Sequence, residues 1–255
     1  MKLLCKTILI CIGISLGLVT TPLLAETSDE WEFKLAPLFL WGMSIDGTTT
    51  IEGTDADLGL DFKDDIFENM EGVFTLHFEA HKGDLLLFAE YQYVNLTPGI
   101  DASSGPVSVS ADIDFIVQMA EFGAGYAISR SDDVLWEVLG GLRWNDHEID
   151  ADVEVTGPLP LPEKIKGGDD WVHPFVGARV SSGFAKDWTL IVRGDVGYGG
   201  SDDTAYHVNA VVDYRFNEWG SVFGGYRHME YDYDGSSYAY DASQRGPMLG
   251  AAFYW

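Results

Sequence analysis

Residues Gly72 to Leu96 read GVFTLHFEAHKGDLLLFAEYQYVNL, and the order of polar and apolar residues in this stretch decides the fold. Apolar and polar side chains alternate up to His81, which is typical of a β-strand with two different faces. Lys82-Gly83-Asp84 then forms a turn, and the alternation resumes at Leu85. The stretch therefore predicts an antiparallel hairpin of two strands, each about ten residues long.

The same pattern recurs along the rest of the chain. Alternating segments of about ten residues, separated by turns, are the signature of a transmembrane β-barrel. The sequence predicts an all-β fold, a closed antiparallel up-and-down transmembrane β-barrel of about ten strands, with eight or twelve as alternatives. The predicted strands are Trp31–Met43, Gly72–His81, Leu85–Leu96, Asp112–Ile128, Val134–His147, Trp171–Phe184, Trp188–Tyr198, Tyr206–Phe216, Ser221–Tyr231 and Gly246–Trp255.

The connections between these strands are of two kinds. Short turns are predicted at Lys82–Asp84, Arg130–Asp133, Ala185–Asp187 and Asn217–Glu218, and long loops at Ser44–Glu71, Thr97–Ala111 and Glu148–Asp170. Short turns at one end and long loops at the other are typical of the periplasmic and extracellular ends of such barrels. An even strand number also returns the C-terminus to the periplasmic side.

Three details of the pattern need separate predictions. Thr48–Leu60 predicts either a rim extension of the first hairpin or a separate strand. Asp64–Met70 begins with acidic residues and predicts a short helix, which covers the barrel mouth or plugs the lumen. Phe115, Val117 and Met119 share a face with Glu121, so we expect a β-bulge near Met119 that returns Glu121 to the lumen.

The N-terminal segment predicts export. Lys2 and Lys6 precede an apolar run from Thr7 to Val19, and the segment ends at Ala25 before the acidic Glu26. This is the pattern of a secretory signal peptide, residues 1–25, followed by a barrel domain, residues 26–255. Both cysteines lie within the signal, so the mature chain has no thiol and no disulfide. A barrel behind a cleaved signal is expected in the cell outer membrane.

Charge excludes one class of partner. Removing the two signal lysines leaves 13 basic against 41 acidic residues, and 13 − 41 gives a net charge of −28. This sign excludes nucleic acid as a partner. An acidic surface suits either contact with lipopolysaccharide bridged by divalent cations or simple solvation of the loops.

The last strand supplies the resemblance to known proteins. Leu249, Ala251, Phe253 and Trp255 share one face, and the chain ends on an aromatic residue. This resembles the terminal strand that the outer-membrane assembly machinery reads as an insertion signal. The mature chain resembles the small Gram-negative outer-membrane barrels, the class that contains the OmpA membrane domain and OmpW. That class includes anchors, narrow channels, adhesins and enzymes, so the resemblance implies a fold and not an activity.

The alternation also predicts which polar residues face the lumen. Three Gly-x-Arg triplets, at Gly141–Arg143, Gly177–Arg179 and Gly225–Arg227, place a small residue beside a guanidinium, which can bind a facing carboxylate. We expect these groups either to fill the bore with ion pairs or to line a narrow polar path. The predicted inward residues are His77, Glu79, Glu90, Gln92, Glu137, Arg143, Asn145, His147, Arg179, Arg193, Asp195, His207, Asn209, Asp213, Arg215 and Arg227.

Catalytic and metal sites have weaker signals. A lipid A deacylase needs a serine beside an outward histidine, and His228 has no such serine on an adjacent strand. A protease of the Asp–His type needs those residues at the rim, where Asp146, His147, His207 and Asp202-Asp203 are candidates. The Asp-x-Asp pairs offer oxygen ligands for hard cations, although solvated loop ends have the same composition. These pairs are Asp55-Ala-Asp57, Asp150-Ala-Asp152 and Asp232-Tyr-Asp234.

These observations together predict a monomeric outer-membrane barrel of structural or narrow small-solute channel type, with acidic extracellular loops. The alternative is a membrane-embedded hydrolase that acts on lipid A or peptides. We expect no enzyme activity, no cofactor and no metal, and we expect contacts with outer-membrane lipid, lipopolysaccharide and the assembly machinery.

Overall fold

The structure is a computed structural model that describes residues 29–255, apart from 98, 105–106, 157–163 and 201–202. The predicted signal peptide and its cleavage site lie outside the described residues. In the part of the chain that is described, no helix is long and apolar enough to cross a membrane.

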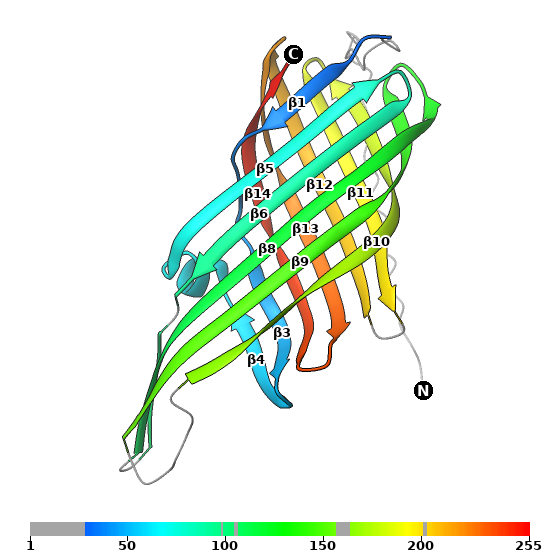
Figure 1. Ribbon diagram of the computed structural model, residues 1–255. Helices are drawn as coiled ribbons and strands as arrows, with labels where there is room; N and C mark the ends of the chain where they lie inside the picture. The colour runs from blue at the N-terminus through cyan, green and yellow to red at the C-terminus, as the bar shows by residue number, and fades with distance from the viewer. Residues whose placement is uncertain (1–28, 98, 105–106, 157–163, 201–202) are drawn as a thin grey trace, which may run out of the picture.

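The wall is a closed antiparallel barrel of ten strands, as predicted (Figure 1). Its first strand consists of three consecutive pieces, β1, β2 and β3, and all three pair with β14. A second ladder, between β1 and β5, closes the barrel. The wall strands are β1 Glu32–Ala36, β2 Phe39–Trp41, β3 Ser44–Ile51, β5 Met70–Lys82, β6 Leu85–Leu96, β8 Val107–Arg130, β9 Val134–Thr156, β10 Lys164–Ala185, β11 Trp188–Gly200, β12 Asp203–Asn217, β13 Gly220–Asp234 and β14 Tyr238–Tyr254.

The two ends of the barrel differ in construction. One end, called here the turn end, carries the four predicted short turns together with the end of β14 (Figure 1). At the opposite, extended end, β8 and β9 run past their neighbours, with lengths of 24 and 23 residues. β7, Gly99–Ser104, pairs with the start of β8 at this end, and β4, Thr54–Leu60, pairs with β3.

The predicted long loops are therefore mostly strands, and their description as loops was wrong. β3 continues the first wall strand and β4 folds back on it, so the rim-extension alternative for Thr48–Leu60 is the correct one. The strands of the extended end have Thr and Asp on their outer faces, at Thr48, Thr50, Asp114 and Asp146. Such segments lack the apolar outer face that identifies a membrane strand, and for this reason the pattern missed them.

The predicted bulge near Met119 is also wrong. β8 runs in register with β9 from Ser108 to Ala127, and its register shift falls between Ala127 and Ser129. Phe115, Val117 and Met119 point inward together with Glu121, and all four are buried. No bulge is needed because the lumen itself is apolar near the extended end.

The first wall strand breaks where it should meet β5. The ladder between β1 and β5 ends at the pair Ala36 and His77, and β2 pairs only with β14. Between β2 and β5, the Thr75 hydroxyl accepts a hydrogen bond from Phe39 N–H at 2.8 Å and donates one to Phe39 C=O at 2.5 Å. This break, called here the seam, is held by a side chain instead of a backbone ladder.

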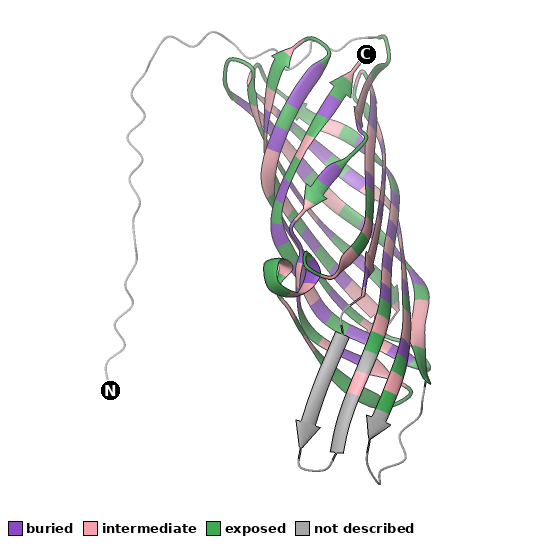
Figure 2. Ribbon diagram, turned by 90° about the vertical axis from the view of Figure 1, so that its left-hand side faces the viewer, coloured by how far each residue is buried: buried purple, intermediate pink, exposed green. Residues whose placement is uncertain are grey.

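A single helical turn lies beside the seam (Figure 2). It is η1, Phe62–Ile66, a π-helical turn whose N-cap Asp61 accepts hydrogen bonds from the N–H groups of Lys63 and Asp64. The predicted short helix is thus present, starting two residues before Asp64. Ile66 is buried among the apolar residues of the lumen, so the turn covers the wall and contributes one side chain to the interior.

Buried and exposed residues alternate along the wall strands (Figure 2). The exposed positions near the turn end are largely aromatic, and these rings stack in groups. Phe33 stacks between Trp31, Phe78 and Trp255 at centroid distances of 5.5 to 6.2 Å. The outer surface of the barrel therefore carries a band of apolar side chains. The stacked aromatic rings form the edge of this band at the turn end.

Candidate functional site

The predicted inward residues lie in the lumen, and most are nearly inaccessible to solvent. His77 is 19% exposed in its side chain and points at two other members of the set, and Asn209 is half-buried. Arg215 is the exception, because it lies exposed at the turn end with its guanidinium 4.1 Å from the Tyr254 ring centroid. The buried members are Glu79, Glu90, Gln92, Glu137, Arg143, Asn145, His147, Arg179, Arg193, Asp195, His207, Asp213 and Arg227.

The first ion-pair network surrounds His77, nearer the turn end. The His77 ring places Nδ1 2.8 Å from Glu90 and Nε2 2.9 Å from Glu79. Arg179 donates to Glu79 at 3.0 Å and to Glu137 at 2.7 Å. Since both ring nitrogens face a carboxylate oxygen, the contacts are satisfied when His77 carries protons on both nitrogens.

The second network lies deeper in the bore. Arg143 donates to Glu121 at 2.6 Å and to Asp195 at 2.9 Å, and Arg193 donates to Glu121 at 2.6 Å. His207 Nδ1 lies 2.9 Å from Asp195. The two arginines also face aromatic rings in the lumen, so each charge has both anionic and π partners.

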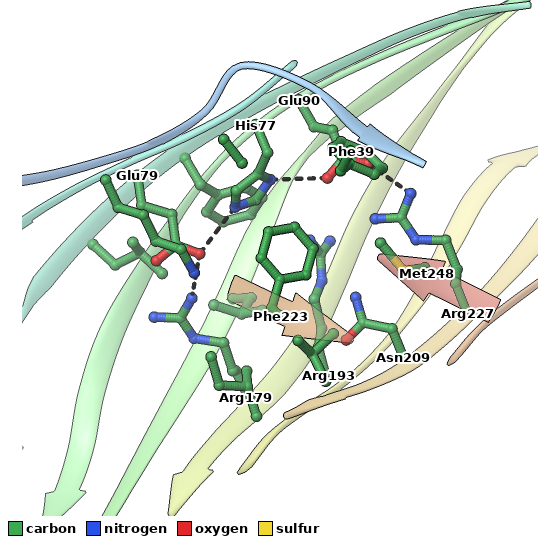
Figure 3. Close-up of a pocket in the computed structure, with 17 residues that line it drawn as sticks. Phe39, His77, Glu79, Glu90, Arg179, Arg193, Asn209, Phe223, Arg227 and Met248 are labelled. Atoms are coloured by element: carbon green, nitrogen blue, oxygen red, sulfur yellow. Dashed lines mark hydrogen bonds and ion pairs between the residues drawn. The ribbon is translucent and has the colours of Figure 1, made fainter. Parts of the chain in front are cut away.

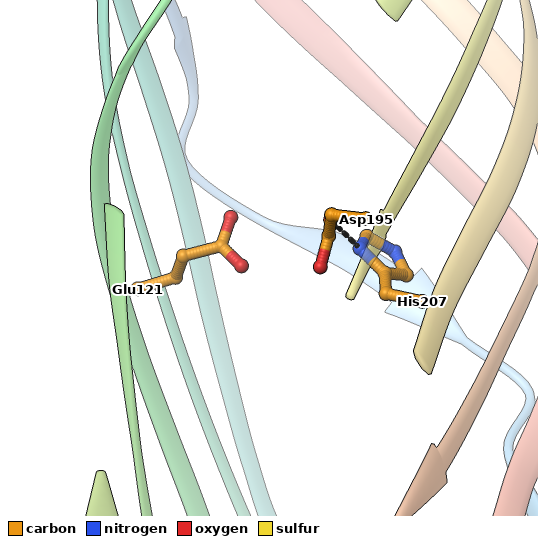
Figure 4. Close-up of side chains that lie close together, drawn as sticks. All are labelled: Glu121, Asp195 and His207. Atoms are coloured by element: carbon orange, nitrogen blue, oxygen red, sulfur yellow. Dashed lines mark hydrogen bonds and ion pairs between the residues drawn. The ribbon is translucent and has the colours of Figure 1, made fainter. Parts of the chain in front are cut away.

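Glu121, Asp195 and His207 lie close enough together to suggest a metal site (Figure 4). Their ligand atoms are within 4.8 Å of one another. However, both carboxylates already accept hydrogen bonds from Arg143 and Arg193. A cation would have to displace two guanidiniums, so the trio is better described as part of an ion-pair network.

The ion pairs cross the bore between strands that are not neighbours in the wall. Arg143 on β9 reaches Asp195 on β11, Arg179 on β10 reaches Glu79 on β5, and Arg227 on β13 lies 2.7 Å from Glu90 on β6. The charges of the lumen nearly cancel, because four buried arginines and the partly exposed Lys34 against six buried carboxylates give 5 − 6 = −1, and a doubly protonated His77 removes the difference. These groups are Lys34, Arg143, Arg179, Arg193 and Arg227 with Glu79, Glu90, Glu121, Glu137, Asp195 and Asp213.

Near the extended end the lumen is filled by apolar and aromatic side chains, called here the aromatic plug. His147 lies within it, at ring-centroid distances of 4.6 Å from Tyr240 and 4.9 Å from Trp171, with Nδ1 2.8 Å from the Tyr238 hydroxyl. The buried members of the plug are Met43, Ile45, Ile66, Leu96, Phe115, Val117, Met119, Trp171, Met229, Tyr231, Tyr238 and Tyr240.

The lumen contains a cavity on the turn-end side of the second network (Figure 3). Its volume is about 80 Å³, and Phe39, Phe223, Arg193, Asn209 and Arg227 are among the side chains that line it. A second cavity, of about 20 Å³, lies beside the plug and shares no lining residue with the first. The two cavities are therefore separate from each other.

The predicted catalytic residues at the rim do not come together in the described part of the chain, and one of them, Asp202, lies outside it. Asp146 and His147 point to opposite sides of β9, and His207 pairs with Asp195 deep in the lumen. The histidine that meets Asp203 is His173, whose Nε2 contacts the Asp203 carboxylate. His228 faces outward between Val208 and Arg245 on the adjacent strands.

The Asp-x-Asp pairs at the extended end are partly occupied by other side chains. Lys166 contacts Asp150, and Lys164 lies 2.6 Å from Asp152. The hydrogen bond from Lys166 lowers the pKa of the Asp150 carboxyl. Asp150 and Asp152 therefore form cross-strand ion pairs at the water-exposed end of the barrel.

The sequence interpretation missed several lumen residues. Lys34 and His173 lie on the inner faces of β1 and β10, and strict alternation along Trp31–Met43 and Trp171–Phe184 would have placed both inside. Phe88 and Phe175 were missed because apolar residues were assigned to lipid, whereas both are buried in the lumen beneath the arginines.

The glycines of the three Gly-x-Arg triplets have a shared geometric role. A Cβ on Gly141, Gly177 or Gly225 would lie 2.3 to 2.4 Å from a carbonyl oxygen of the adjacent strand. Glycine is required there because the neighbouring backbone comes this close. These glycines therefore leave room for the neighbouring backbone as well as for neighbouring side chains.

No family model matches the sequence, and no curated protein matches it either. The structure is similar to that of the outer-membrane protease OmpT from Escherichia coli, with a TM-score of 0.57 and 9% identity, covering 91% of this chain and 99% of that one. The translocator domain of the autotransporter NalP from Neisseria meningitidis has a TM-score of 0.48 and 12% identity, covering 88% of each chain. The overlap with OmpT shows the fold alone, and that fold is the outer-membrane β-barrel.

Proposed function

We propose that the protein is exported, loses its signal peptide near Ala25, and spans the outer membrane of a Gram-negative bacterium. The outer surface supports this proposal. On β9 the outward side chains from Trp136 to Trp144 are apolar or glycine, and the 144 − 136 = 8 steps cover roughly 20 Å of membrane at ordinary strand rise and tilt. The next outward residues are Asp146 and Glu148, which belong in water.

The outer face of the last strand supports recognition by the assembly machinery. Leu249, Ala251, Phe253 and Trp255 are all exposed on the outer surface of the barrel, where a partner can reach them before insertion. The acidic extended end supports contact with lipopolysaccharide through bridging divalent cations. We further propose that the barrel is monomeric.

In the membrane, the protein acts as a closed structural barrel that holds the extended end above the lipid. One observation carries this proposal: Arg143 has no exposed surface and joins Glu121 on β8 to Asp195 on β11 in the middle of the bore. Since charged side chains tie the wall together across the lumen, solutes have no open route. A structural role is therefore favoured over a narrow channel.

Conductance in planar lipid bilayers tests the structural role. The full barrel is expected to give no single-channel events above background at ordinary salt concentrations. Replacing the plug residue Trp171 with alanine opens space at the extended end but leaves the ion pairs in place, so W171A is expected to stay silent as well. Steady single-channel conductance of the unaltered protein would overturn the structural role and favour the channel.

The hydrolase alternative has a separate test. Lipid A from cells that produce the protein is expected to have an unchanged mass spectrum, and the purified barrel is expected to leave peptides intact. Cleavage that disappears on His173→Gln would contradict the structural role, because His173 and Asp203 are the acid–base pair nearest the extended end.

A further inference from the structure

The cavity on the turn-end side has hydrogen-bond donors that no protein group uses. Arg227 is 3% exposed, and its Nε is buried without a hydrogen-bond partner. Asn209 lies directly beside Arg227 in the ladder between β12 and β13, and its amide forms no hydrogen bond with the described residues. Lys34 also lines the cavity, with its ammonium 6.0 Å from the Phe223 ring centroid, and no carboxylate of the described residues lies within 4 Å of it.

The acceptors around the same cavity, in contrast, are already in use. Glu79 accepts hydrogen bonds from His77 and Arg179 on one oxygen and from His81 on the other. Glu90 accepts a hydrogen bond from Gln92 on one carboxylate oxygen and one from His77 on the other. A cavity with free donors and occupied acceptors recognises a ligand that accepts hydrogen bonds, and the nearby guanidiniums and ammonium favour an anion.

The donors lie along one side of the cavity. Arg193, Asn209 and Arg227 are consecutive partners across β11, β12 and β13, and they lie in a row in Figure 3. The remaining lining is largely apolar and includes Leu86, Phe88, Leu139 and Phe223. A ligand that fits both parts has an anionic head and a short apolar tail.

Cavity size and access limit the ligand further. The volume of about 80 Å³ admits only a small ligand of a few non-hydrogen atoms. Solvent reaches the network from the turn end, where the His81 side chain is 34% exposed. In the membrane orientation proposed above, that end faces the periplasm.

From these observations we propose that the turn-end cavity binds a short-chain monocarboxylate from the periplasmic side. The carboxylate accepts hydrogen bonds from Asn209 and Arg227 and is attracted by Lys34. The aliphatic tail packs against Phe88 and Leu139. This binding site is independent of the closed or open state of the extended end.

Isothermal titration calorimetry of the full chain purified in detergent tests the site, with butyrate, acetate and inorganic phosphate as probes at constant ionic strength. Butyrate is expected to bind saturably and more tightly than phosphate. Asn209→Leu keeps the side-chain size but removes the amide, and we expect it to weaken butyrate binding about tenfold. Asn145→Leu is the matched control, because Asn145 lines the other cavity, and it is expected to bind like the unaltered protein.

Lys34→Gln provides a second variant if Asn209→Leu does not fold, since Lys34 is partly exposed near the turn end. It is expected to weaken butyrate binding several-fold. The proposal is overturned if butyrate shows no saturable binding, or if N209L and N145L bind it equally well. Phosphate binding as tight as that of butyrate would overturn the assignment to a carboxylate with an apolar tail.

Discussion

Arg143 has no exposed surface, although its guanidinium carries a full charge in the middle of the bore. Its carboxylate partners, Glu121 and Asp195, come from two different strands. Removing a single partner from such a network leaves buried charge without compensation, and this loss costs more than the net stability that the intact pair provides.

Replacing Arg143 with methionine is therefore expected to lower the free energy of unfolding by about 3–5 kcal/mol. Urea titration of the refolded protein, followed by tryptophan fluorescence, measures the change. Arg245→Met is the control, because Arg245 pairs with Asp46 on the exposed outer surface and its loss is expected to cost about 0–1 kcal/mol. Equal effects of the two substitutions would contradict the role of the cross-bore network.

Glycine at position 177 is expected to resist even the smallest substitution. A Cβ there would lie 2.3 Å from the Gly194 carbonyl oxygen, whereas a Cβ on Gly194 would meet nothing closer than 3.9 Å. We expect Gly177→Ala to destabilise the barrel by about 1–3 kcal/mol through overpacking, and Gly194→Ala to have little effect. Thermal unfolding of the two variants compares the two positions. Similar midpoint temperatures of unfolding would rule out the close backbone approach at Gly177.

At the scale of the elements, the seam is the place where the wall has least backbone pairing. β2 has a ladder only with β14, and Thr75 alone satisfies the Phe39 backbone groups on the β5 side. A seam of this kind opens more easily than a continuous backbone ladder, because fewer hydrogen bonds must break at once.

Thr75→Val is expected to leave the Phe39 N–H buried without a partner, at a cost of about 1–3 kcal/mol. Hydrogen exchange measured by mass spectrometry should become faster in the peptides that cover β2 and η1. The matched control is Thr50→Val, because Thr50 is a threonine of β3 whose hydroxyl donates to the exposed Asp55. If exchange changes equally in both variants, the hydroxyl of Thr75 does not hold the seam.

The elements also show how far sequence reasoning reaches. The membrane part of the wall was predictable, since lipid on one face and a polar lumen on the other impose strict alternation. The aromatic plug was not predictable, because the rule assigns apolar side chains to the outer, lipid-facing side of the wall. Phe115 and Met119 instead have apolar surroundings inside the barrel and water outside it. The cross-bore pairs were also beyond reach, because alternation shows that Arg143 points inward but not which strand it faces.

At the scale of the whole molecule, charge is divided between the interior and the surface. The lumen carries a formal charge near zero, so nearly all of the −28 of the predicted mature chain lies outside it. Acidic residues gather toward the extended end, and the turn end is dominated by aromatic rings. This asymmetry gives the molecule a definite orientation in the proposed membrane.

Cysteine labelling checks that orientation, because the predicted mature chain contains no cysteine of its own. Ser236→Cys, in the exposed connection between β13 and β14, is expected to react with a membrane-impermeant maleimide on intact cells. Lys186→Cys, in a turn at the opposite end, is expected to react only after the outer membrane is permeabilised. The reverse pattern would mean that the extended end faces the periplasm.

The three-piece first strand has a consequence for the order of folding. Leu35 pairs with Phe253, so the closing contact joins residues 253 − 35 = 218 positions apart, whereas each hairpin forms from neighbouring segments. Loop-closure entropy makes such a distant contact late and slow. Until it forms, the pairs that cross the bore cannot assemble, as for Arg179 with Glu79 and Arg227 with Glu90. Strand closure and cross-bore ion pairing are therefore expected to occur together as one cooperative, rate-limiting event, which leaves few partly closed intermediates able to persist in lipid.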